Sequence, residues 1–386
     1  MRILYVFHSL AYWGGIERIL VDKMNYLVSE YGYDVYMLTT GQGKHPIPYH
    51  LDSLVHLEDL NIRMHQQYQF HGLKRLFVNW KLTRLFKQRL AERIRTIQPD
   101  IIVCTTSSYL EIDLLTKIKG NIPLVIESHS ICQRILGQNG LRNKFVDYIY
   151  RRGFSKAQVL VALTEGDALV WHQMHPNVKV IPNMVHLNDG PLSSLKNKRV
   201  IWVGRLDYQK RPMEIISIWQ KVYSSFPDWQ LDIYGEGEQL QELEHAVQQL
   251  DMNIHIHQPT DRIFDAYRES SILVSTSMFE PFGLVIPEAM SCGLPVVAYN
   301  CPFGPSYILT DGVDGFLIQN SNQQAFADKL CQLMADDSLL YRMGMAGLKT
   351  SHRFEAKQIM PQWKTLFEQM LFSQEVPEHT SSQKES

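Results

Sequence analysis

The chain has 386 residues, too many for one ordinary hydrophobic core, and this length suggests two domains of common size. Its hydrophobic content of 45% can fill both cores, whereas its formal net charge of -2 gives no general attraction to nucleic acid. No nucleic-acid partner is therefore expected, and any electropositive site must be local.

Cysteine usage and the N-terminus give expectations about location. The five cysteines are scattered and include no C-x-x-C pair, which argues against a disulfide framework or a zinc site. The N-terminal segment lacks the small-residue cleavage site of a signal peptide, and no apolar run approaches the roughly 18 residues that span a bilayer. We expect a cytoplasmic protein, either soluble or peripherally attached to the inner face of a membrane.

Short β-branched runs alternate with helical patterns along the first half of the chain. The predicted strands cover residues 2–7, 34–39, 100–105, 123–127, 159–163 and 178–182. This alternation predicts a parallel sheet covered by helices, formed by an N-terminal domain of residues 1–187.

A polar linker at residues 188–198 precedes a second series of the same kind, in a domain of residues 199–354. Its predicted strands cover residues 199–204, 230–235, 253–257, 272–276 and 295–299. The fold class is therefore α/β, with two doubly wound Rossmann-like domains. Because ligands bind beyond the carboxyl ends of parallel strands, we expect the functional site in a cleft where the two domains face each other. An amphipathic helix is predicted at 355–372, followed by a disordered polar tail at 373–386.

The stretch EPFGLVIPEAMSCGLP, residues 280–295, predicts an anion site. Pro287 is tolerated only near the first turn of a helix, which places the helix start near Gly283. The amides of Gly283, Leu284 and Val285 then lack partners within the helix and can bind a phosphate.

Glu280 and Glu288 flank this helix start. Carboxylates repel phosphate, so we interpret them as hydrogen-bond acceptors for hydroxyls on either side of a diphosphate: a ribose and a sugar. The alternative is that Glu280 is solvated in a loop and Glu288 lies on an exposed helix face.

Two cations and two glycine pairs follow other predicted strands. Arg205 and Lys210 come after the strand that ends at Gly204, where each could form a charge-assisted bond to a diphosphate worth about 1.5–3 kcal/mol. An ordinary basic loop is the alternative. The remaining donor-binding candidates are glycines at the ends of strands or in strand-to-helix turns, although none completes a G-x-G-x-x-G fingerprint: Gly14, Gly15, Gly204, Gly235 and Gly237.

Taken together, these residues resemble the family 4 glycosyltransferases, which are retaining enzymes of the GT-B fold. The matching motifs occur in order over nearly the whole chain: GGIER, ESHS (127–130), IPN (181–183), VGRLDYQK, YGEGE, FEPFGLVIPEAMSCGLPVVA and DGVDGFLI (311–318). The E-x(7)-E element with EAMSCGLPVV is the most specific of them.

The resemblance implies a role for each matching residue. Glu288 would bind the nucleotide ribose and Glu280 the transferred sugar, whereas Arg205 and Lys210 would bind the donor diphosphate. His129 would contact the donor sugar, although a lone histidine can equally be structural. The resemblance also implies that the helix at 355–372 crosses back to the first domain.

The implied reaction is transfer of a hexose-type sugar from a nucleotide sugar to a hydroxyl of a glycan or lipid-linked acceptor, in cell-surface polysaccharide synthesis. A UDP-sugar is favoured over a GDP-sugar, although no residue identifies the base. No D-x-D triplet occurs, so we expect metal-independent transfer with no cofactor. The alternatives are a nucleotide-sugar epimerase, a phosphorylase, or a nucleotide-sugar-binding protein without turnover. A nicotinamide dehydrogenase is disfavoured because neither domain has the full glycine fingerprint.

Residues 63–95 contain nine Lys or Arg and a single acid, Glu92. Apolar residues recur among them at near-helical spacing: Leu73, Leu76, Phe77, Trp80, Leu85, Leu90 and Ile94. One interpretation is docking on anionic lipid. The other is a surface helix whose apolar side packs on its own sheet.

Overall fold

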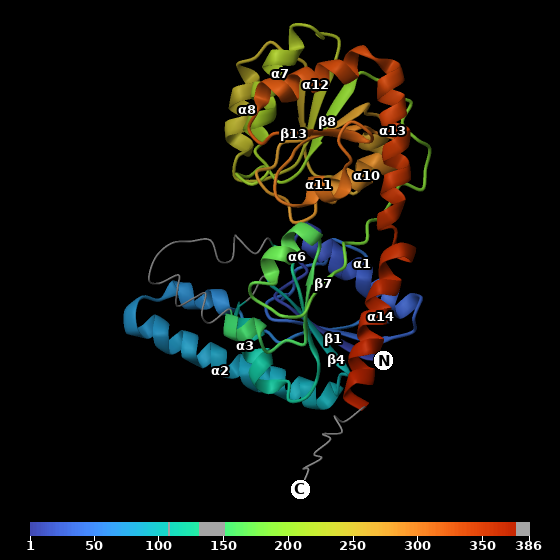
Figure 1. Ribbon diagram of the computed structural model, residues 1–386. Coiled ribbons are helices and arrows are strands. Elements are labelled where there is room, and N and C mark those ends of the chain that lie inside the picture. The colour runs from blue at the N-terminus through green and yellow to red at the C-terminus, as the bar shows by residue number, and fades with distance from the viewer. Residues whose placement is uncertain (107–108, 131–150, 376–386) are drawn as a thin grey trace.

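The computed structural model describes residues 1–106, 109–130 and 151–375. Two sheets form the centres of two domains, which lie one above the other in Figure 1. The expected fold of two Rossmann-like domains is confirmed. Most of the tail predicted at 373–386 lies outside the described residues.

The N-terminal domain is built on a parallel seven-stranded sheet in the order β3-β2-β1-β4-β5-β6-β7. Its strands are β1 (Arg2–Phe7), β2 (Asp34–Thr39), β3 (His56–Asp59), β4 (Ile101–Thr105), β5 (Leu124–Glu127), β6 (Val159–Ala162) and β7 (Val178–Val180). The helices named within its described residues are α1 (Gly15–Ser29), η1 (Met64–Gln69), α2 (Gly72–Ile97), α3 (Tyr109–Ile118) and α6 (Glu165–Trp171). The central strands β4, β5 and β6 are buried along their whole length, which explains their continuous apolar sequences.

The C-terminal domain has a parallel six-stranded sheet in the order β10-β9-β8-β11-β12-β13. Its strands are β8 (Arg199–Val203), β9 (Gln230–Tyr234), β10 (Ile254–His257), β11 (Ile272–Ser275), β12 (Val296–Tyr299) and β13 (Gly315–Ile318). Its helices are α7 (Pro212–Tyr223), α8 (Leu240–Gln248), α9 (Ile263–Arg268), α10 (Val285–Ser291), α11 (Gly304–Ile308), α12 (Gln323–Ala335), α13 (Asp337–Ser351) and η2 (His352–Phe354).

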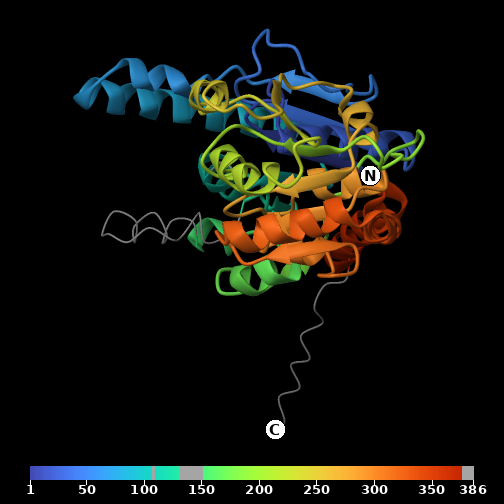
Figure 2. The same ribbon diagram turned by 90° about the horizontal axis from the view of Figure 1, so that it is seen from above.

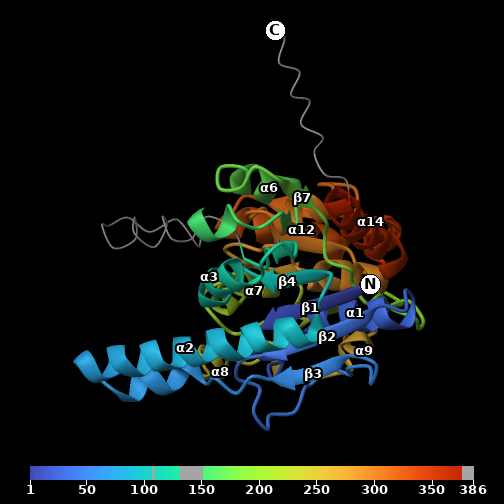
Figure 3. The ribbon, with the colours of Figure 1, turned by 90° about the horizontal axis from the view of Figure 1, so that it is seen from below.

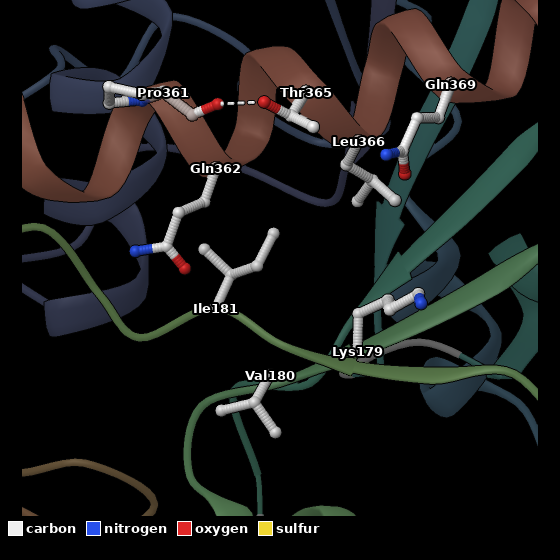
Figure 4. A pocket seen from close by; sticks show the side chains of 8 residues that line it. All are labelled: Lys179, Val180, Ile181, Pro361, Gln362, Thr365, Leu366 and Gln369. Atoms are coloured by element: carbon white, nitrogen blue, oxygen red, sulfur yellow. Dashed lines mark hydrogen bonds between the residues drawn. The ribbon is translucent and has the colours of Figure 1, made fainter.

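The last helix, α14 (Ala356–Glu375), leaves the C-terminal domain and runs along the N-terminal one (Figure 1). Its apolar face packs into the core formed by β1, β2 and α1 through Ile359, Met360, Trp363, Leu366 and Phe367. A pocket of about 380 Å³ lies between α14 and the end of β7, lined by residues that include Lys179, Ile181 and Gln362 (Figure 4). This pocket contains none of the predicted site residues.

Helix α2 is attached to its domain along only half of its length. Its buried residues are Phe86, Leu90, Ile94 and Ile97, which all belong to the C-terminal half. The N-terminal half projects beyond the body of the domain, as Figures 2 and 3 show. The expectation that the apolar side packs on the sheet therefore holds for Leu90 and Ile94 but is wrong for Leu73, Leu76, Phe77 and Trp80, which are exposed.

Candidate active site

Helix α10 begins at Val285, two residues later than the sequence suggests, with Leu284 as its N-cap. Pro287 still falls in the first turn, where the helix tolerates it. Gly283 has φ +95°, a left-handed conformation that favours glycine, and it turns the chain into the helix. Among the described residues, the amides of Gly283, Leu284 and Val285 donate no hydrogen bond, so all three are available to a ligand.

Glu280 is held beside Lys210. Its carboxylate accepts hydrogen bonds from Lys210 Nζ and, at 2.6 Å, from Ser277 Oγ. Its backbone N–H donates to the carbonyl of Pro302 at 2.6 Å. Glu280 is only 4% exposed, so the interpretation of a solvated loop carboxylate is wrong for this residue.

Glu288 lies in the first turn of α10 and contacts the other domain. Arg18 Nη1, from α1, donates to its Oε1 at 2.8 Å, and the Tyr267 hydroxyl donates to Oε2 at 3.2 Å. Burial raises the pKa of the Glu288 carboxyl, and the charge of Arg18 offsets part of that rise. Glu288 is therefore not on an exposed helix face but forms an ion pair across the domain boundary.

Arg205 is placed differently from Lys210. Its side chain is 61% exposed and its Nη2 lies 3.0 Å from Asp207 Oδ2. It also lies close enough to Glu17 of α1 to affect that carboxyl: burial raises the pKa of Glu17, and a hydrogen bond from its own backbone and the charge of Arg205 lower it. Arg205 is thus an exposed cation paired with Asp207, whereas Lys210 is paired with the buried Glu280.

The Gly14–Gly15 turn faces α10. A side chain at Gly15 would first meet Leu284 of the other domain, 3.3 Å away. A side chain at Gly14 would collide with Glu17 Oε2 at 2.0 Å. The carboxylate of Glu17 therefore covers Gly14, where the sequence predicts a phosphate, and it would have to move before a phosphate approached this residue.

The glycines of the second domain have a packing role. A Cβ at Gly235 would lie 2.0 Å from the carbonyl of Gly204, and one at Gly237 would lie 2.4 Å from that of Leu206. The loops after β8 and β9 consequently pack backbone against backbone, which keeps Arg205 and Lys210 at the carboxyl edge of the sheet. Donor contact by Gly204, Gly235 and Gly237 stays a prediction.

His129 follows β5 and is buried, with Nε2 3.1 Å from Glu127 Oε2. The sequence does not identify Glu127 as its partner. Arg18, Glu17 and Tyr267 were missed as well, although Glu17 and Arg18 belong to the GGIER motif and occupy the first turn of the helix that faces the cleft.

The described ranges contain no group of three metal-ligating side chains that could hold an ion. They also contain no helix long and apolar enough to cross a membrane.

Two family models match the chain and together span residues 13–350. Residues 13–189 match the model described as Glycosyltransferase Family 4, and residues 189–350 match the one described as Glycosyl transferases group 1. The chain belongs to the family 4 glycosyltransferases. The junction between the two matches falls in the segment that connects the two sheets of this glycosyltransferase.

Relatives and solved structures agree with this assignment. An uncharacterized glycosyltransferase of Haemophilus influenzae is 25% identical over 94% of this chain and 99% of its own length. The amylovoran biosynthesis glycosyltransferase AmsD of Erwinia amylovora is 26% identical over 95% of this chain and 99% of its own length.

The fold is also that of TarM from S. aureus, with a TM-score of 0.77 and 15% identity. The match covers 95% of this chain and 99% of the TarM chain. HepE of Anabaena, solved with UDP and glucose, matches with a TM-score of 0.73 and 20% identity. This match covers 96% of this chain and 100% of the HepE chain.

Proposed function

We propose that this enzyme transfers a hexose-type sugar from a UDP-sugar to a hydroxyl of a glycan or lipid-linked acceptor, with retention of configuration and without a metal ion. Synthesis of a cell-surface polysaccharide is the proposed setting, in the cytoplasm or at the inner face of a membrane. The amylovoran relative supports the setting, and the UDP and glucose bound to HepE support the donor.

The observation that carries the proposal is the arrangement around the α10 N-terminus. The three free amides come between Glu280, which pairs with Lys210, and Glu288, which pairs with Arg18, along the chain. Amides and Lys210 suit a diphosphate, whereas the two carboxylates suit hydroxyls of a ribose and a sugar. Arg205 is exposed and contacts Asp207 and Gln209, and it would leave these partners to bind the phosphates.

In the proposed reaction the bond between the anomeric carbon and the diphosphate oxygen breaks, and the acceptor oxygen bonds to the same face of that carbon. The proton of the acceptor hydroxyl passes to the departing diphosphate. Negative charge then develops on the departing nucleoside diphosphate. Lys210, Arg205 and the α10 amides would stabilise this charge, which is the part that a metal ion has in other transferases. Glu280 would orient the sugar and Glu288 the ribose.

Thermal unfolding with a panel of nucleotide sugars tests the donor. A UDP-sugar at about a hundred times its Kd is expected to raise the free energy of unfolding by roughly 2.7 kcal/mol, with GDP-sugars giving smaller shifts at equal concentration. The shift and the transfer rate are expected to persist in EDTA. Equal stabilisation by GDP-sugars would remove the UDP preference, and turnover of donor without an acceptor would favour an epimerase.

The projecting half of α2 is the proposed membrane contact. The apolar tip, defined as Leu73, Leu76, Phe77 and Trp80 of α2 together with Tyr68 of the preceding η1, is exposed, with Leu73 at 84%. Cations surround the tip: Arg75 lies 4.7 Å from the Tyr68 ring and Arg84 5.5 Å from the Trp80 ring. Apolar side chains among cations fit the interface of an anionic bilayer.

Flotation with liposomes tests this contact. The wild-type protein is expected to float with anionic vesicles and to be released by salt, whereas an L73S/F77S/W80S variant is expected to bind at least tenfold more weakly, because each buried apolar side chain contributes about 1.5–3 kcal/mol. L169S replaces an equally exposed leucine outside α2 and serves as the control. Equal flotation of the triple variant and the wild type would rule out the tip.

A further inference from the structure

A buried charged network lies behind His129. Lys23 of α1 donates a hydrogen bond from Nζ to Glu127 Oε2 at 2.5 Å, and His129 Nε2 lies 3.1 Å from the same oxygen. All three residues are at most 8% exposed. The mechanism proposed above uses neither Lys23 nor Glu127.

Stability does not account for this network. Burying two charges generally costs more than their attraction returns, and apolar residues of the same size are often the more stable choice. Within the residues that the structure describes, the Lys23 ammonium otherwise lies over aromatic rings, with Nζ 3.8 Å from the ring centre of Trp363 in α14 and 5.9 Å from that of Tyr5. Glu127 Oε1 is buried without a hydrogen-bond partner in the described part of the chain. Such an arrangement points to a function for the carboxylate.

The carboxylate fixes the state of the histidine. Burial alone would raise the pKa of Glu127, but the charge of Lys23 and the contact with His129 outweigh burial and hold this pKa below its usual value. An ionised carboxylate can only accept a hydrogen bond, so His129 Nε2 must carry the proton. Nδ1 forms no hydrogen bond with any described residue, and it is therefore the nitrogen left for a ligand.

We propose that Lys23 and Glu127 are positioning residues that set the tautomer and orientation of His129 toward the transferred sugar. The proposal rests on the function proposed above, in which His129 contacts that sugar. Trp363 holds Lys23 in place, so the helix that crosses from the second domain also supports the site of the first. The sequence of contacts runs from α14 through α1 and β5 to the carboxyl edge of the sheet.

Kinetics of E127Q and K23M test the proposal. Both are expected to lower kcat by about tenfold or more, with little change in the KM of the donor; the size is taken from the loss seen when the carboxylate that orients a metal-binding histidine is removed. Because Glu127 acts through His129, E127Q is expected to have no further effect in an H129A background. D314N is the control: Asp314 is an equally buried carboxylate that binds Thr310 and Thr350 and no proposed site residue.

Two results would overturn the inference. One is a kcat of E127Q equal to that of the wild type; the other is an equal loss from E127Q with and without His129, which would indicate a structural role only. Ring ¹⁵N shifts of His129 give a readout independent of activity. A proton on Nε2 is expected in the wild type, and a proton on Nδ1 alone would reject the inference even if the wild type transferred no sugar. Absence of transfer with Nε2 protonated would instead count against the proposed function.

Discussion

Replacing Lys210 by alanine is expected to lower kcat/KM by about 10²–10³-fold, the usual loss when one group that stabilises a developing oxyanion is removed. Lys210 is suited to this part because Glu280 fixes its ammonium at the carboxyl edge of the sheet, beside the α10 N-terminus. Steady-state kinetics with the best donor from the thermal panel measures the loss. Most of it should appear in kcat, because the charge on the departing diphosphate grows toward the transition state.

K221A is the matched control, since Lys221 is an exposed lysine in the last turn of α7 of the same domain. K210A also leaves the buried Glu280 with Ser277 as its remaining partner, so part of the loss could come from a displaced loop. A K210A/E280Q variant removes that unpaired charge. Activity of K210A within threefold of the wild type, with donor binding intact, would exclude Lys210 from the diphosphate site.

Replacing Arg18 by methionine is expected to destabilise the protein by about 3–5 kcal/mol, because it leaves the buried charge of Glu288 without its ion-pair partner. Calorimetry or urea unfolding measures the loss. An R18M/E288Q variant removes both charges and is expected to recover most of the stability but not donor affinity, because Glu288 is the proposed ribose ligand. R18M as stable as the wild type would contradict the importance of this contact.

The same pair predicts a pH dependence. The pKa of Glu288 is raised from 4.5 by burial, so the folded protein keeps this proton at pH values where the unfolded chain has lost it. The contribution of Glu288 to the free energy of unfolding is therefore fully present below pH 4.5 and falls as the pH rises through the folded-state pKa. Without the charge of Arg18 the folded-state pKa is higher still, so R18M should extend this fall toward higher pH, and R18K should not.

The sequence predicts the fold well because buried parallel strands leave a strong local signal. All eleven predicted strands are present, with ends that differ by no more than two residues. The two missed strands, His56–Asp59 and Gly315–Ile318, are four-residue strands at the edges of the two sheets. His56–Asp59 is mostly polar and is exposed or half-buried at every position, so it lacks an apolar run, whereas Gly315–Ile318 is apolar but contains a single β-branched residue.

The sequence predicts the parts of the candidate site that depend on the local backbone. It does not predict the contacts between side chains that lie far apart along the chain. The motif around Gly283 identifies the helix start, because proline and glycine restrict the backbone locally. The partner of Glu288 is 270 residues away in the other domain, and no local pattern reports such a contact. The sequence does not predict that the α2 tip projects from the domain either. The helical spacing of its apolar residues does not indicate whether they pack against another part of the chain.

The return of α14 to the first domain has a consequence for biosynthesis. The core around β1 remains open until Met360, Trp363 and Phe367 have emerged from the ribosome, although most of the other residues of that core precede them by more than 150 positions. The nascent N-terminal lobe must therefore wait, incompletely closed, while the whole second lobe is translated. Chaperone binding to that exposed face and sensitivity to premature stop codons before residue 356 are the expected signs of this delay.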